Sequence, residues 1–147
     1  MKNFFYLLIV SILFLSCGKG SENKTEARAA NETQPDRVEV LYFYGAQRCI
    51  TCRAIEAHTV ALLDSLYAKE QAEGKVVYTV IDLSKKGNES LADQYEVTWS
   101  SLFVNRWKDG EEHVNNLTEF SFSHAKNEPD QFKEGLKNKI DELLKEL

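Results

Sequence analysis

Apolar runs and amphipathic stretches alternate along the chain from about residue 37 to its end. The segment 38–44, VEVLYFY, is β-branched and aromatic, which is typical of a buried strand. After a short connection at 45–48, apolar spacings of three and four predict a helix from about Cys49 to Glu70. The apolar side of that helix is expected to hold Cys52, Ile55, Leu62 and Leu66, with Thr59 and Leu63 beside them.

The middle of the chain repeats this alternation. Residues 75–83, KVVYTVIDL, predict a second apolar strand, which follows Gly74 as a plausible helix stop. A polar loop covers 84–88, and residues 89–95 predict a short helix. Because the second strand is separated from the first by a long helix, parallel pairing of the two is expected.

The last third of the chain predicts a hairpin and a closing helix. Residues 101–107, SLFVNRW, predict a third strand, and Asp-Gly at 109–110 is a hairpin turn signal. A fourth strand is expected somewhere within 112–122. The final helix is expected to begin near Pro129, a residue that suits a first helical turn. Its apolar side consists of Phe132, Leu136, Ile140, Leu143 and Leu144.

The order of these elements is β-α-β-α-β-β-α. Strands that are separated by helices imply crossovers and parallel pairing, whereas the closing hairpin is antiparallel. The predicted fold class is therefore α/β, with a central mixed β-sheet flanked by helices.

Composition narrows the functional classes. The chain has 147 residues, a net charge of −5 and 43% apolar residues, which suits one globular domain. Basic residues are scattered, and no Lys/Arg cluster forms a phosphate-binding stripe. We therefore expect no nucleic acid among its partners.

The first residues predict export. Lys2 is followed by an apolar stretch from Phe4 to Leu15 that only Ser11 interrupts. This stretch is too short to span a bilayer comfortably, which takes roughly 20 apolar residues. It fits the hydrophobic region of a secretory signal peptide.

The sequence that follows, LSCG, resembles the signal of a bacterial lipoprotein. The resemblance implies that Cys17 is lipidated and becomes the mature N-terminus, although Phe14 stands where such signals usually have leucine. An ordinary cleaved signal peptide, or an uncleaved anchor with Cys17 as a bystander, is the alternative. Three regions are expected: a lipoprotein signal peptide at 1–16, a lipidated N-terminus with a flexible polar tether at 17–36, and a domain at 37–147. The protein would be exported and attached to a bacterial membrane through its lipid, facing the periplasm or the cell exterior.

Two thiols remain if Cys17 carries lipid. Cys49 is placed at the end of a strand and the start of a helix, where unpaired N–H groups and the helix dipole stabilise a thiolate. We therefore expect the pKa of Cys49 to fall, and Arg48 and Arg53 act in the same direction. Cys52 lies one turn further, on the core face. This placement predicts an exposed nucleophile and a sheltered resolving thiol.

Together these motifs resemble the thioredoxin family over residues 37–147. The resemblance rests on VEVLYFY, on CITC opening a long helix, on VVYTVIDL, on YEVTWSSLFV and on the KDG turn. It implies a thioredoxin-like fold and thiol–disulfide exchange, in which Cys49 attacks a substrate disulfide and Cys52 resolves the mixed disulfide. It further implies protein disulfides as substrates, a membrane reductase as electron donor, and no cofactor besides the redox-active Cys49–Cys52 disulfide. We expect a monomer that works as a reductase.

The chain departs from the family in three places. The motif reads Arg-Cys-Ile-Thr-Cys where thioredoxins have Trp-Cys-Gly-Pro-Cys. The family's buried acid on the first strand corresponds here to Tyr42 or Phe43. Glu56, one turn beyond Cys52, is the alternative to that acid, but a solvent-facing Glu56 is favoured. The family's cis-proline corresponds to Ser101, for which a trans bond is expected because a cis non-proline bond costs about 2.5–4 kcal/mol.

The Ser100–Ser101 segment is expected to keep the backbone role of the missing proline loop. Trp99 stands beside it, so we predict a substrate groove lined by Trp99, Ser100 and Ser101, with Arg48 on the opposite rim. The absence of proline would also leave the thiols more open to a metal ion.

Two other interpretations of the dithiol stay open. A metal-binding or metal-delivery module would use the two thiolates as half of a tetrahedral zinc shell, completed by a second copy of the chain. The histidines at 58, 113 and 124 do not have ligand spacing, so no metal residues are assigned. A purely structural disulfide, in a fold used only for binding, would gain little because its loop is very small.

Overall fold

The computed structural model describes residues 35–147. The predicted signal peptide, the lipidation of Cys17 and all but the last two residues of the tether lie outside the described residues. Within 35–147, no helix combines the length and apolar character that a membrane crossing requires.

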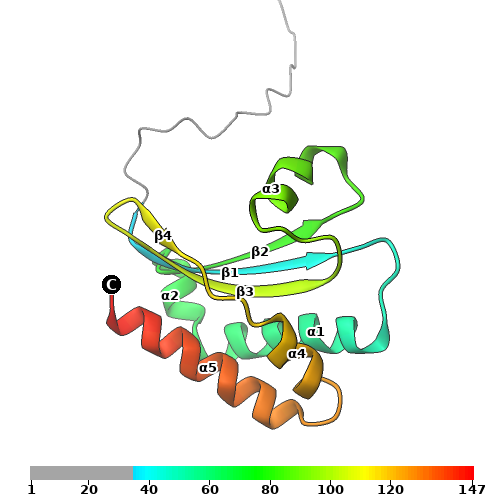
Figure 1. Cartoon of the computed structure of the whole chain (residues 1–147). Coiled ribbons are helices and arrows are strands. Elements are labelled where there is room, and N and C mark those ends of the chain that lie inside the picture. The colour runs from blue at the N-terminus through cyan, green and yellow to red at the C-terminus, as the bar shows by residue number, and fades with distance from the viewer. Residues whose placement is uncertain (1–34) are drawn as a thin grey trace, which may run out of the picture.

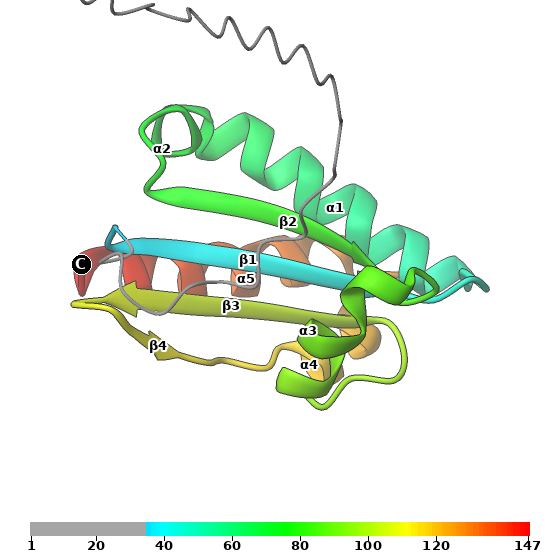
Figure 2. The same ribbon diagram turned by 90° about the horizontal axis from the view of Figure 1, so that it is seen from above.

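A four-stranded sheet forms the centre of the domain, with the strand order β2-β1-β3-β4 (Figures 1 and 2). The strands are β1 (Arg37–Tyr44), β2 (Val76–Asp82), β3 (Ser101–Lys108) and β4 (Glu111–His113). β1 pairs parallel with β2 and antiparallel with β3, and β3 pairs antiparallel with β4. The predicted mixed sheet with a closing hairpin is confirmed, and the α/β fold is thioredoxin-like. The connection from β1 to β2 is the expected parallel crossover, whereas β3 follows a helix but pairs antiparallel with β1, so the expectation of parallel pairing is wrong there.

The central strand β1 is buried on both faces. Val38, Val40 and Tyr42 belong to the main core, whereas Leu41 and Phe43 belong to a second core on the opposite face. A strand covered on both sides has no polar alternation, and this explains the continuous apolar run that predicted it. The strand ends at Tyr44, so its last residues lead directly into the dithiol loop.

Helices cover the two faces unequally. α1 (Ile50–Leu66) and α5 (Pro129–Lys145) lie along one face of the sheet, and α3 (Glu89–Gln94), preceded by the short helix η1 (Lys86–Asn88), lies on the other (Figure 1). For the last helix, α5, the prediction of its core-facing side is confirmed for four residues. Its buried residues are Phe132, Leu136, Ile140 and Leu143.

The single helix predicted from Cys49 to Glu70 is wrong at its end. The chain leaves helical geometry at Tyr67, and a second helix, α2 (Ala68–Ala72), follows. The break turns Tyr67 into the core, where its hydroxyl donates a 2.7 Å hydrogen bond to Asp141 on α5. Leu66, the last residue of α1, is exposed, so its predicted place on the buried side is wrong.

The strand expected within 112–122 is short and begins earlier, and most of that range is helical. β4 has three residues, and α4 (Thr118–His124) follows it. Asn116 accounts for the start of the helix, since its Oδ1 accepts the Thr118 N–H (2.9 Å), while Asn115 Nδ2 donates to the carbonyl of Val104 on β3 (3.0 Å). An asparagine side chain that bonds the backbone two residues further on favours a turn or a helix start over a continued strand.

Gly135 lets α4 approach α5 closely. A Cβ atom at this helical position would lie within 3.0 Å of three ring atoms of Phe120. The Phe120 ring is also held between Phe132 and His124, at centroid distances of 6.2 and 4.6 Å. Space for α4 therefore depends on the absence of a side chain at 135.

Replacing Gly135 by alanine should destabilise the domain, although alanine favours helices more than glycine does. The added methyl overpacks the Phe120 contact, so we expect a loss of about 1–3 kcal/mol in the free energy of unfolding. Urea unfolding measures it. Gly87→Ala is the matched control, because a Cβ there meets no atom within 4 Å. Equal stability of G135A and G87A would contradict the packing argument.

Candidate functional site

Cys49 forms the N-cap of α1. Its backbone is extended (φ −69°, ψ 165°), and its Sγ accepts the N–H of Cys52 at 2.9 Å. This is the geometry in which serine or aspartate usually caps a helix, with sulfur in place of oxygen. The predicted strand-to-helix corner is therefore present, with the first cysteine at the helix terminus itself.

Cys49 and Cys52 form a disulfide, with their Cα atoms 5.0 Å apart. Cys52 is 5% exposed, whereas Cys49 is exposed to solvent. The difference in burial agrees with the expected difference between an attacking and a resolving sulfur. The catalytic roles of the two residues stay predictions.

Tyr42 lies beneath the dithiol turn. The side chain is fully buried, and its hydroxyl donates a 2.7 Å hydrogen bond to the carbonyl of Cys52. Burial raises the pKa of Tyr42 despite the opposing effects of Arg48 and Ser100, so the hydroxyl keeps its proton and stays a donor. Tyr42 is one of the two residues, with Phe43, that correspond to the buried acid of the thioredoxin family. Sequence reasoning missed this contact.

Arg48 and Glu56 form an ion pair next to the dithiol. The guanidinium also lies over the ring of Tyr44, with Cζ 4.3 Å from the ring centroid. Burial would lower the pKa of Arg48, but the hydrogen bond with Tyr42 and the charge of Glu56 outweigh it and raise that pKa. Glu56 is therefore partly exposed and paired with Arg48. It does not form a buried acid under Cys52, in agreement with the favoured prediction of a solvent-facing Glu56.

The serines at the missing proline are buried in an all-trans backbone. Among residues 35–147 there is no cis peptide bond, as expected for a loop without proline. Ser100 is 5% exposed and Ser101 3% exposed. Ser101 is paired with Phe43 of β1, and its hydroxyl donates to the Trp99 carbonyl (3.0 Å). The segment is therefore anchored to the strand that leads into the dithiol.

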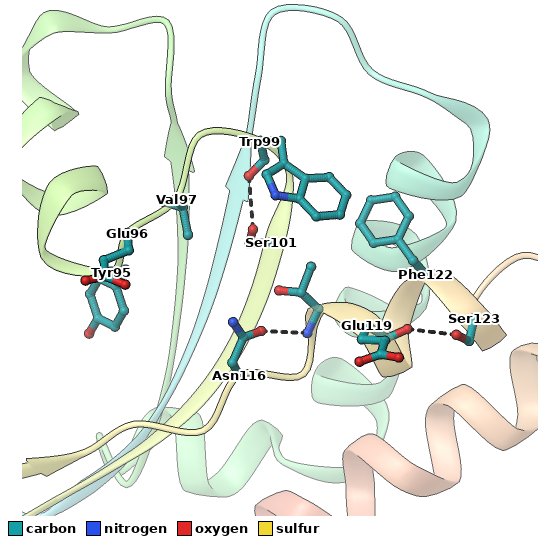
Figure 3. A pocket seen from close by; sticks show the side chains of 10 residues that line it. Tyr95, Glu96, Val97, Trp99, Ser101, Asn116, Glu119, Phe122 and Ser123 are labelled. Carbon is teal, nitrogen blue, oxygen red and sulfur yellow. Dashed lines mark hydrogen bonds between the residues drawn. The ribbon is translucent and has the colours of Figure 1, made fainter.

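A groove of about 730 Å³ opens between this segment and α4 (Figure 3). Trp99 is 57% exposed at its wall, and its ring centroid is 5.1 Å from that of Phe122. The lining residues are Tyr95, Glu96, Val97, Trp99, Ser101, Asn116, Thr118, Glu119, Phe122 and Ser123. Of the predicted groove residues, Trp99 and Ser101 line it, whereas Ser100 and Arg48 do not.

Half of this groove was missed by sequence reasoning because α4 was missed. A helical signal did exist, since Leu117, Ser121 and Ala125 recur every four residues and face inward. The two buried positions of α4, Thr118 and Ser121, are both polar, which hid that periodicity. His124 is the last residue of this helix.

Metal-ligating side chains do not gather in the described part of the chain. No group of three or more His, Cys, Asp or Glu residues within 35–147 is arranged to hold a metal ion. His124 is placed against Glu128, with Nε2 3.6 Å from Oε2, far along the chain from the two cysteines.

Comparison with known proteins gives structural neighbours only. No family model matches the chain, and no curated protein matches it. A solved structure described as a malarial protein shares 19% sequence identity with this chain, at a TM-score of 0.42. The match covers 67% of this chain and 96% of the other. Thioredoxin-2, described as a component of the malaria parasite's protein secretion machinery, shares 21% sequence identity with this chain, at a TM-score of 0.42. This match covers 65% of this chain and 90% of the other. The fold assignment above rests on the strand order and connections of this chain.

Replacing Tyr42 by phenylalanine should weaken the link between the sheet and the dithiol turn. Loss of the hydrogen bond to Cys52 should lower the free energy of unfolding by about 1 kcal/mol. Tyr78→Phe on the neighbouring strand is the matched control, because the Tyr78 hydroxyl is buried without a hydrogen-bond partner. That variant should be as stable as the parent or more so. Urea unfolding of the oxidised proteins measures both, and equal losses would contradict the assigned role of the Tyr42 hydroxyl.

Proposed function

We propose that the protein is a thiol–disulfide oxidoreductase that uses Cys49 and Cys52. The observation that carries this proposal is the disulfide at the N-terminus of α1, with one exposed and one sheltered sulfur. In the reduced protein, the Cys52 N–H and the helix N-terminus stabilise negative charge on the Cys49 sulfur. A thiolate is the species that attacks a disulfide.

The exchange proceeds in two substitutions. The Cys49 thiolate attacks one sulfur of the substrate disulfide, the S–S bond breaks, and the departing substrate thiolate takes up a proton. Cys52 then loses its proton and attacks the Cys49 sulfur, which breaks the mixed disulfide and releases the second substrate thiol. The substrate gains two electrons and two protons in total, and the protein returns to the Cys49–Cys52 disulfide.

The proposed direction is reduction of disulfides in exported proteins. A dithiol donor must then regenerate the reduced protein, and a reductase embedded in the membrane would supply those electrons. Attachment through a lipidated Cys17 would keep the domain near that donor. A tether at 17–36, as expected from the sequence, would give it reach to substrates outside the membrane.

Neighbouring residues would position the two sulfurs. Tyr42 holds the backbone of Cys52 from below, which keeps the resolving sulfur in the first turn of α1. Arg48 and Glu56 form a neutralised pair at the rim, so the guanidinium is held close to the dithiol without adding a net charge. The backbone of Ser100 and Ser101 would face the bound substrate.

The metal-binding alternative uses the same two thiolates. Metal analysis of the reduced, chelator-treated protein after reloading with zinc distinguishes the two functions. Retention of zinc by pairs of chains would favour the alternative, whereas exchange activity with no retained metal supports the oxidoreductase.

Replacing Cys52 by serine should trap substrates. The variant keeps the attacking sulfur and lacks the resolving one, so mixed disulfides through Cys49 should accumulate. They are detected as reductant-sensitive complexes on non-reducing gels of cells that express the full chain. Cys49→Ser is the matched control and should trap none. Trapping by C49S alone would reverse the assigned roles, and trapping by neither variant would contradict exchange with proteins.

A further inference from the structure

We propose that the groove between the loop before β3 and helix α4 receives a lysine or arginine side chain of the substrate, so that disulfides flanked by basic residues are preferred. This inference rests on the proposed function and adds the substrate class to it. The observations behind it are the aromatic wall, the carboxylates of the lining and the connection of the groove to the dithiol.

The aromatic wall is formed by Trp99 and Phe122. The two rings belong to different elements, the loop before β3 and helix α4, and stand next to each other (Figure 3). More than half of the Trp99 side chain stays exposed in spite of this contact. An exposed indole face attracts a cation, and tryptophan is the best of the aromatic residues in this role.

The charges of the lining are all negative. Glu96 and Glu119 are both exposed and line the groove, and the ten lining residues include neither lysine nor arginine. Glu96 has a positive φ of 54°, which lets the backbone turn from α3 into the groove wall. The remaining polar lining consists of neutral hydroxyl and amide groups. Charge complementarity therefore favours a cationic occupant over a neutral or anionic one.

The groove and the dithiol share one segment of backbone. Ser101 lines the groove, while its neighbour Ser100 interacts with the Tyr42 hydroxyl that is bonded to Cys52. Helix α4, which forms the other wall, packs against α1, which begins at the dithiol. An extended substrate segment over Ser100 and Ser101 would thus place its cysteine toward Cys49 and a flanking side chain in the groove.

The affinity of the oxidised full chain for peptides tests this directly. The probes are short disulfide-bridged peptides that carry arginine, citrulline or glutamate beside one cysteine. Calorimetry at low ionic strength should show binding of the arginine peptide about tenfold tighter than that of the citrulline peptide, and weakest binding of the glutamate peptide. Added salt should reduce the arginine preference, because exposed charges are screened. Equal affinities of all three peptides would overturn the proposal.

Substitutions in the groove test whether the preference for the arginine peptide arises there. The double variant Glu96→Gln/Glu119→Gln should lose most of the arginine preference, and Trp99→Leu should weaken binding of the arginine peptide more than that of the citrulline peptide. Glu111→Gln/Glu134→Gln is the matched control, since it removes two exposed carboxylates outside the groove and changes the net charge equally. An equal loss in the control variant would mean that overall charge, and not the groove, selects the peptide.

Exchange with a small uncharged disulfide separates this proposal from the proposed function. The reduced parent and the Glu111→Gln/Glu134→Gln variant, whose changes lie outside the groove, should react equally fast with hydroxyethyl disulfide. No reaction of either protein would contradict the oxidoreductase function, and the affinity ratios would still decide the charge preference. Reaction with the small disulfide, but equal affinity for all peptides, would remove only the inference about the groove.

Discussion

The hydrogen bond from the Cys52 N–H to the Cys49 sulfur determines how the site is built. A helix needs an acceptor at its N-cap, and the sulfur that fills this need is the one exposed to solvent. The helix then carries the second sulfur one turn inward, where it is sheltered. The Cys49 sulfur therefore has two roles: it caps the helix, and it is the exposed member of the dithiol.

The central strand holds this corner in place. β1 is buried on both faces, and Tyr42 near its end bonds the carbonyl of Cys52. The same strand pairs with Ser101 through Phe43, so the dithiol turn and the serine segment are fixed to one rigid support. A trans serine backbone occupies the place of the expected proline, and Trp99 just before it is left exposed at the groove.

Elements defined by local pattern could be predicted, and elements defined by distant contacts could not. Strands β1, β2 and β3 follow from apolar runs, and the closing turn at Asp109-Gly110 has the positive φ values that its sequence indicated. The helix break at Tyr67 depends on Asp141, more than seventy positions away. Helix α4, the second wall of the groove, was hidden because its buried positions Thr118 and Ser121 are polar, and its close approach to α5 requires Gly135. The Tyr42 contact with Cys52 likewise joins two elements that only the folded chain brings together.

The order in which the two thiols react tests the account most directly. The fully reduced protein would be treated with a limiting amount of iodoacetamide at neutral pH, and peptide mass spectrometry would identify the cysteine that is modified. An exposed sulfur at the helix terminus and a sheltered one in the first turn predict that Cys49 is modified well before Cys52. Equal modification, or modification of Cys52 first, would contradict the assignment of Cys49 as the attacking thiol.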